Sequence, residues 1–455
     1  MNFRIDKGLD IPVMGAPEQK IDEGRRTETV ALLGRDHIGL RPVLKVSEGD
    51  RVRIGQPLFV ERKHPGIAYT SPGGGTVREI NRGDKRRLLS VVVALDDTED
   101  KELFPSWPVD ALPGLGRARV VENLLRTGLW TALRTRPYDK VPDPASVPRS
   151  VFVTATDTNP LSARPEVVIG ETPDAFIHGL EIVAHLTEGP LFVCKETNTA
   201  LPQASAPNIQ VANFWGPHPA GLPGTHIHFL DPVNASKSVW HLNYQDVIAI
   251  GKSFTGGHLW TERIVALAGP EVTRPRLLRT RLGADIGTLS EGERREQKEP
   301  SGHRIISGSL LSGRAVQSRE RHLGRFHNQI AVLAESPAVT APRQNTGWRS
   351  GLRGIFSAHG TGAKPPARGF PFTTAMHGGP SAMLPFVGYD RVMPLDILAA
   401  PLLRALIVGD TDTAQSLGCL ELGEDDLALL TFMCPGKFDY GPLLLDALAR
   451  IEKEG

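Results

Sequence analysis

The chain has 455 residues, more than one hydrophobic core usually absorbs, so we expect three or four domains of roughly 100–200 residues each. Lysine and arginine number 52 and aspartate and glutamate 51. The resulting net charge of +1 excludes a chain-wide field that would attract nucleic acid or an anionic membrane.

The first hundred residues predict an all-β unit. The opening fifteen residues lack the apolar core of a signal peptide, and residues 30–94 contain five short apolar strands separated by Gly, Asp and Pro. A Gly49-Asp50 turn followed by Gly75-Thr76-Val77 has the order found in the barrel-sandwich hybrid of biotinyl and lipoyl carriers. We predict such a domain within residues 1–100, with Lys63 as a solvated loop lysine rather than a modified one.

The pattern then alternates between helices and strands. Residues 118–135, 173–189 and 244–252 have helical periodicity, and residues 150–158, 190–197, 208–215 and 225–231 are strand-like. Strands separated by helices indicate an α/β layer with a largely parallel sheet, which we assign to residues 101–257.

The last third of the chain predicts a mixed unit and a helical unit. Residues 258–335 contain strand candidates interrupted by a charged run, and residues 336–382 form an irregular connection rich in Gly, Pro, Arg and Thr. Apolar residues recur at helical spacing in four later segments. We therefore expect a helical domain within residues 336–455, with helices over 396–408, 410–417, 424–433 and 442–453.

Short motifs for nucleotide, metal or nucleophilic chemistry are incomplete. Each G-x-G-x-x-G candidate lacks its third glycine, no G-x-S-x-G is present, and no stretch reaches the ~20 apolar residues that cross a bilayer. His226 and His228 lie two apart on a predicted strand and would share a face, but no Cys or carboxylate completes a metal site. Cys194, Cys419 and Cys434 lack close spacing, so we expect three buried thiols and a reducing compartment.

Longer segments resemble one family. The A-type subunit of the sodium-translocating NADH:quinone oxidoreductases is resembled by residues 124–142, 153–161, 218–233, 243–257, 266–284, 324–330, 389–398 and 434–444. That family is related to the peripheral subunit of ferredoxin:NAD reductase and to the NADH- and FMN-binding subunit of respiratory complex I. The resemblance implies an α+β multidomain protein with a Rossmann-like flavin domain, a ubiquitin-like β-grasp domain over 258–335 and a C-terminal helical domain.

The resemblance also implies a chain that binds no redox cofactor of its own. Flavin-binding relatives carry a glycine-rich loop where this chain has Thr127 to Arg134, so Leu129, Trp130 and Leu133 replace small residues. Cluster-binding relatives carry several cysteines where this chain has Cys434 alone, and one thiolate cannot hold a four-ligand cluster. FMN, riboflavin and iron–sulfur centres are thus expected in partner subunits.

The implied function is that of a peripheral subunit on the cytoplasmic side of the bacterial inner membrane. It would join five other subunits, including integral membrane ones, in a translocase that passes electrons from NADH to ubiquinone and drives sodium outward. No nucleic acid is expected as a partner. Attachment would depend on protein contacts, because the net charge of +1 argues against independent adhesion to lipid.

A quinone site needs a few donors in an apolar cleft. We hypothesise that Trp130, Arg134, Arg136 and Tyr138 line or gate a quinone-head site, because they supply an indole face, guanidinium donors and a phenol. Alternatively, the two arginines bind acidic neighbours or a partner subunit, and Trp130 only fills the former flavin space. Two other functions stay open: a purely structural docking subunit, and an electron-entry subunit that binds FMN and NADH.

Overall fold

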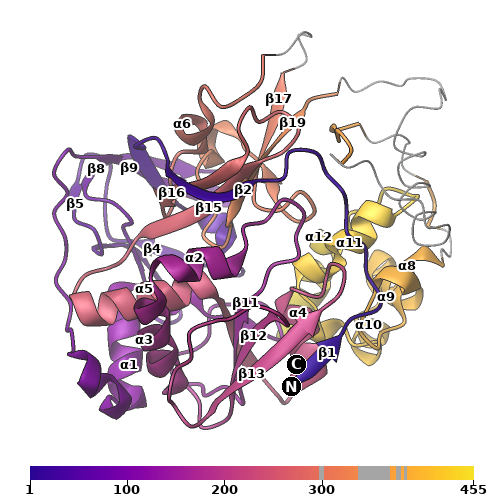
Figure 1. Ribbon diagram of the computed structural model, residues 1–455, viewed down its shortest axis with the longest axis horizontal. Helices are drawn as coiled ribbons and strands as arrows, with labels where there is room; N and C mark the ends of the chain where they lie inside the picture. The colour runs from indigo at the N-terminus through magenta and orange to yellow at the C-terminus, as the bar shows by residue number, and fades with distance from the viewer. Residues whose placement is uncertain (297–301, 337–368, 376–380, 384–386, 455) are drawn as a thin grey trace.

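The computed structural model describes residues 1–296, 302–336, 369–375, 381–383 and 387–454. Within these ranges, four groups of elements are built around the chain's hydrophobic cores (Figure 1).

The predicted barrel-sandwich domain is present. One antiparallel sheet has the order β3-β9-β8-β5 and the other the order β4-β6-β7, and side chains from both sheets share one core. All five predicted strands are found, and Lys63 is exposed in the loop between β6 and β7. The strands are β3 (Thr29–Leu33), β4 (Pro42–Leu44), β5 (Arg51–Val52), β6 (Pro57–Glu61), β7 (Ala68–Thr70), β8 (Gly75–Arg82) and β9 (Leu88–Leu95), with short 3-10 turns η1 (Gly34–Asp36) and η2 (Asp84–Arg86).

The second group is an α/β layer, as predicted. Its six strands have the order β1-β13-β12-β11-β14-β10, all parallel except β10. The central strands are mostly apolar, because helices cover both faces of a parallel sheet. The elements are β1 (Asn2–Arg4), η3 (Val109–Gly114), α1 (Arg117–Thr127), η4 (Leu129–Ala132), β10 (Arg134–Arg136), β11 (Val151–Ala155), α2 (Pro165–Glu171), α3 (Pro173–Ala184), β12 (Leu191–Glu196), β13 (Ile209–Trp215), α4 (Pro223–Leu230), β14 (Val239–Asn243) and α5 (Tyr244–Gly256).

Helices α3 and α5 pack unusually closely because each has a glycine at the contact. A Cβ atom on Gly179 would lie 2.0 Å from the carbonyl oxygen of Val247, and one on Gly251 would lie 2.0 Å from that of Ala175. Both glycines therefore serve helix packing, and Gly251 lies inside a helix rather than in a loop.

The third group is a mixed sheet with the order β18-β17-β19-β15-β16-β2. Its helix α6 begins at Asp285, whose side chain accepts a hydrogen bond from the Gly287 amide at 2.8 Å. The elements are β2 (Glu18–Glu23), β15 (Glu262–Ala268), β16 (Arg276–Arg281), α6 (Ile286–Ser290), β17 (His303–Ser307), β18 (Arg314–Ala315), η5 (Ser318–Glu320) and β19 (Gln329–Ala334).

The C-terminal helices form a core of their own, drawn in yellow and orange in Figure 1. Each of the four predicted helices is present, and α11 has the predicted bounds. The 336–382 connection falls mostly outside the described residues. The elements are α8 (Gly388–Val392), α9 (Ala399–Val408), α10 (Thr411–Ser416), η6 (Cys419–Glu421), α11 (Glu424–Met433) and α12 (Tyr440–Glu454).

The first 23 residues cross the other groups before the barrel begins. Strand β1 pairs with β13, the Gly8 amide donates to the Arg391 carbonyl at 3.0 Å, and β2 pairs with β16. Figure 1 shows this indigo segment running past α9 and up to β16. Residues 1–23 therefore add strands to two sheets that lie outside the predicted 1–100 unit.

Two local predictions are wrong. The 225–231 strand is the helix α4, which begins at Pro223, a residue suited to a first helical turn. The predicted 118–135 helix ends at Thr127, because Gly128 adopts a left-handed conformation (φ 79°), and the chain continues as η4 and β10.

Candidate functional site

The segment from Leu129 to Lys140, here called the junction segment, contains all four predicted quinone-site residues. It follows Gly128, where a Cβ atom would lie 2.3 Å from the Thr70 hydroxyl oxygen, so α1 ends tightly against the barrel domain. All of η4 is buried. The Trp130 indole N–H donates to the Pro142 carbonyl at 2.9 Å, and its ring stands edge-on to Trp240 with centroids 5.3 Å apart.

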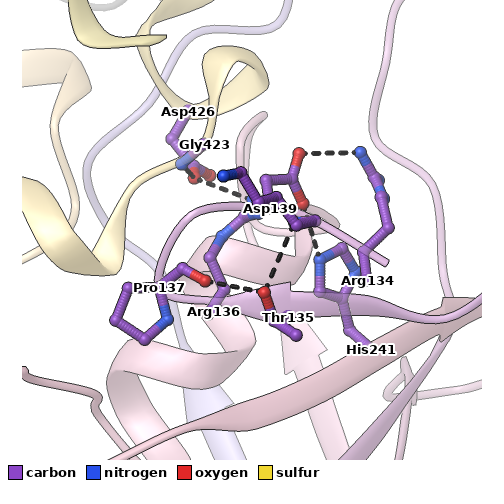
Figure 2. A network of polar contacts seen from close by, with 9 residues as sticks. Arg134, Thr135, Arg136, Pro137, Asp139, His241, Gly423 and Asp426 are labelled. Atoms are coloured by element: carbon purple, nitrogen blue, oxygen red, sulfur yellow. Dashed lines mark hydrogen bonds and ion pairs between the residues drawn. The ribbon is translucent and has the colours of Figure 1, made fainter. Parts of the chain in front are cut away.

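Strand β10 then turns back over itself and brings a carboxylate between two arginines. The turn places Tyr138 and Asp139 at positive φ (77° and 51°). Asp139 accepts a hydrogen bond from Arg134 Nη1 at 2.9 Å and a shorter one from Arg136. The ring of His241, on the neighbouring strand β14, donates from Nε2 to Asp139 Oδ1 at 3.1 Å (Figure 2).

Charge and burial determine the protonation states in this network. Burial alone would raise the pKa of Asp139, but Arg134 and Arg136 outweigh it and hold that pKa well below its usual range. Burial lowers the pKa of His241 to about 3, so the ring is neutral. Because Asp139 is ionised and can only accept, His241 must carry its proton on Nε2.

Arg136 links the α/β layer to the C-terminal helices. Its Nη2 lies 3.6 Å from Asp426 Oδ2, in the first turn of α11, and both side chains are at most 3% exposed. A Cβ atom on Gly423 would lie 2.1 Å from the same Nη2, so a larger residue there would displace the Arg136 guanidinium. Burial raises the pKa of Asp426 to about 6 although Arg136 opposes the shift.

The ends of the junction segment contact the remaining units. The Arg134 guanidinium lies 4.5 Å from the ring centre of Phe326, in the third group. Lys140 forms an ion pair with Glu452 on α12 and lies beside Gly39 of the barrel domain. Tyr138 packs against the C-terminal core. The segment thus contacts all four groups of elements.

The four predicted residues divide into two pairs. Trp130 and Arg136 are buried, whereas the side chain of Arg134 is 20% exposed and Tyr138 is half-buried. The alternative prediction that both arginines bind acidic neighbours is confirmed by the contacts with Asp139. No contact tests the quinone assignment, which stays a prediction.

Sequence reasoning missed three members of the network: Asp139, His241 and Asp426. Asp139 lies three residues after Arg136, so the local charge pairing was visible in the sequence. The ion pair between Arg136 and Asp426 joins positions almost three hundred residues apart, so it could not be predicted from a local sequence pattern.

The histidines near residues 218–241 do not converge. The His226 ring donates from Nε2 to the Ala220 carbonyl at 3.0 Å inside the core, whereas the His228 ring, on the same helix, pairs with Glu421 at 2.7 Å. Among the described residues, no three His, Cys, Asp or Glu side chains are grouped to hold a metal ion. The three cysteines are free and buried, as predicted.

Comparison with known proteins adds a consistent set of similarities. Family models described as the NqrA N-terminal barrel-sandwich hybrid domain, the NqrA second alpha/beta domain and the NQRA C-terminal domain match residues 3–96, 115–259 and 264–318. The chain is 52% identical over 456 residues to the A-type subunit of the Na(+)-translocating NADH-quinone reductase of Pseudomonas aeruginosa strain UCBPP-PA14, and 50% identical over 455 residues to that of Yersinia pestis bv. Antiqua strain Angola; each match covers 100% of both chains. An NAD+-reducing [NiFe]-hydrogenase structure matches 52% of each chain at 14% identity, and its TM-score of 0.35 supports no conclusion.

Proposed function

Because the chain belongs to the NqrA family, the A-type subunits of the Na+-translocating NADH-quinone reductases, we propose that it acts as a peripheral subunit of such a translocase. The observation that carries this proposal is the 52% identity over the full length of both chains. No helix among the described residues is long and apolar enough to span a bilayer. The proposed position is the cytoplasmic side of the inner membrane, in contact with five other subunits.

Within that complex, we propose that this chain serves as a scaffold without redox centres of its own and that partner subunits carry the flavins and iron–sulfur centres. Leu129, Trp130 and Leu133 are buried where the flavin-binding relatives have glycines, which favours a filled flavin space. The Cys434 thiol lies 3.2 Å from the Tyr440 hydroxyl, inside the C-terminal core. At fold level, the proposal includes a Rossmann-like second domain and a β-grasp third domain, related to the complex I and ferredoxin:NAD reductase subunits.

Of the four residues predicted to contact quinone, we propose that the two partly exposed ones, Arg134 and Tyr138, do so. Trp130 and Arg136 are buried and donate inside the protein, to the Pro142 carbonyl and to Asp139, so they support the segment rather than touch quinone. Arg134 donates one hydrogen bond, to Asp139, among the described residues, and its other N–H groups suit a quinone carbonyl. Tyr138, half-buried in the same turn, offers a ring face and a hydroxyl.

Ubiquinone titration of the purified full-length chain tests this assignment. Arg134→Gln is expected to weaken quinone binding by at least tenfold, because a carbonyl loses a charged donor worth about 1.5–3 kcal/mol. Arg126→Gln, on the exposed face of α1, is the matched control and should bind normally. Equal affinities in both variants would remove Arg134 from the site.

The same titration separates the two alternative functions. A purely structural docking subunit shows no saturable quinone binding in any variant. The electron-entry alternative predicts a yellow protein with stoichiometric flavin, which an absorbance scan of freshly purified chain detects.

A further inference from the structure

The hairpin that joins β8 to β9 concentrates positive charge at its tip. Residues 82–87 contain four cations, Arg82, Lys85, Arg86 and Arg87, and one carboxylate, Asp84, and all five side chains are exposed. The tip therefore carries a net charge of +3 in a chain of net charge +1, which leaves −2 for all other residues. The neutral average thus conceals one strongly basic surface.

These cations are not neutralised by the protein. Among the described residues, none of the four forms an ion pair with a carboxylate; Arg82 donates only to the Arg86 carbonyl, at 3.1 Å. The exposed Arg319 adds a further positive charge nearby, since its carbonyl accepts a hydrogen bond from Ser90 on β9 at 2.7 Å.

The backbone of the tip gives a second, independent observation. Lys85 and Arg86 both adopt positive φ (54° and 60°), a region in which Gly or Asn is favoured at hairpin turns. Residues held in sparsely populated backbone conformations cluster at functional sites. The turn itself is closed by a backbone hydrogen bond from the Gly83 amide to the Arg87 carbonyl at 2.9 Å, and the side chains of Lys85, Arg86 and Arg87 form no hydrogen bond among the described residues.

We infer that this tip, residues 82–87 with Arg319, is an electrostatic contact for the anionic head groups of a phospholipid bilayer. The buried core of a protein–protein interface is more apolar and poorer in charge than the rest of a protein surface, and none of the large exposed hydrophobic residues lies in the β8–β9 hairpin. A convex basic tip needs no matching recess on a bilayer, whose negative charge is spread over a plane. Figure 1 shows β8 and β9 at the periphery of the molecule.

This contact would orient the protein on the membrane rather than anchor it. Each basic residue near an anionic surface strengthens binding by about fivefold, and the attraction decays within a Debye length of about 8–10 Å. The inference does not rest on the quinone assignment, since it uses a different domain.

Vesicle co-sedimentation of the full-length chain tests the inference. Phosphatidylglycerol-containing vesicles should bind the chain at low ionic strength, pure phosphatidylcholine vesicles should not, and raising the salt should release it. The triple variant Lys85→Gln/Arg86→Gln/Arg87→Gln should lose about 100-fold in affinity. The matched control Lys7→Gln/Arg119→Gln/Lys453→Gln removes three exposed cations elsewhere and should bind within a few-fold of the unmodified chain.

Three outcomes would overturn the inference. One is absence of binding to phosphatidylglycerol at low salt, and another is an equal loss in both triple variants. The third is a tip variant that binds vesicles normally but no longer joins the other subunits, which would assign the tip to an acidic protein surface. Circular dichroism of both variants verifies that each is folded, and the salt dependence tests the unmodified chain without any substitution.

Discussion

Removing the charge of Asp139 should destabilise the protein strongly. Asp139 is the shared acceptor of Arg134, Arg136 and His241, and its side chain is 7% exposed. In Asp139→Asn, the buried Arg136 guanidinium keeps one carboxylate partner among the described residues, Asp426, at 3.6 Å. Breaking a buried ion pair on one side costs about 3–5 kcal/mol, because the remaining charge is uncompensated. Arg134 adds little, since water reaches its partly exposed side chain.

Urea unfolding followed by circular dichroism measures the change. We expect the free energy of unfolding to fall by about 3 kcal/mol or more at pH 7. The control is Asp6→Asn, in an Arg4–Asp6 pair with both side chains over 70% exposed, and it should not differ from the unmodified chain. Adding Arg136→Met to Asp139→Asn should recover part of the loss, because it removes the unpaired cation.

The pH dependence follows from the depressed pKa of Asp139. A carboxylate of lowered pKa contributes its stabilisation above the unfolded value of about 4 and loses it only as the pH falls further. The difference between Asp139→Asn and the unmodified chain should thus be constant from pH 5 to pH 8. A loss below about 1 kcal/mol for Asp139→Asn would refute the view that this carboxylate holds the junction together.

Three further predictions concern single positions. The pKa of Asp426 is raised to about 6, so between pH 4 and pH 6 the folded state holds a proton that the unfolded state has lost, and the free energy of unfolding should fall as the pH rises through this range. Asp426→Asn should reduce the difference in unfolding free energy between pH 4.5 and pH 8 by about 1–3 kcal/mol, measured by urea titration. An unchanged difference would contradict the raised pKa. Gly251→Ala places a methyl group against the Ala175 carbonyl and should cost about 1–3 kcal/mol in the same unfolding assay, whereas a neutral result would mean that α3 and α5 separate freely. Asn243 caps α5 by accepting from the Gln245 amide at 2.9 Å, so Asn243→Ala should lower the thermal midpoint through a loss of about 1 kcal/mol, and Asn243→Asp should retain it.

The spacing of apolar residues was sufficient to predict those helices and strands whose form depends on their own sequence. Helix α11 was predicted to its first and last residues from apolar residues at helical spacing, and three acidic residues in its first turn favour the same start. Strands β11 and β12 were evident as short, continuous apolar runs. The α4 segment misled because His and Ile alternate there, although burial of its Gly224 and Thr225 against other elements selects a helix.

The site was only partly accessible to the same reasoning. The junction segment stood out by its Trp, Arg and Tyr residues, and Asp139 within it could have been paired with its arginines. Burial of Trp130 and the role of Asp426 depend on how distant elements pack, which one sequence does not reveal. The basic tip of β8–β9 was hidden by the overall charge balance, because a sum over the chain does not show where charges gather.

The course of the first 23 residues affects how the protein is made. Asn2 pairs with Asn213 and Ile21 with Leu277, so residues 1–23 are translated before partners that lie more than two hundred positions later. At 5–20 residues per second, this delay is about 10–50 s. During synthesis β1 and β2 therefore stay unpaired until β13 and β16 have been translated. A bulky fusion at the amino terminus would act on both sheets together, and a carboxyl-terminal tag leaves that pairing untouched.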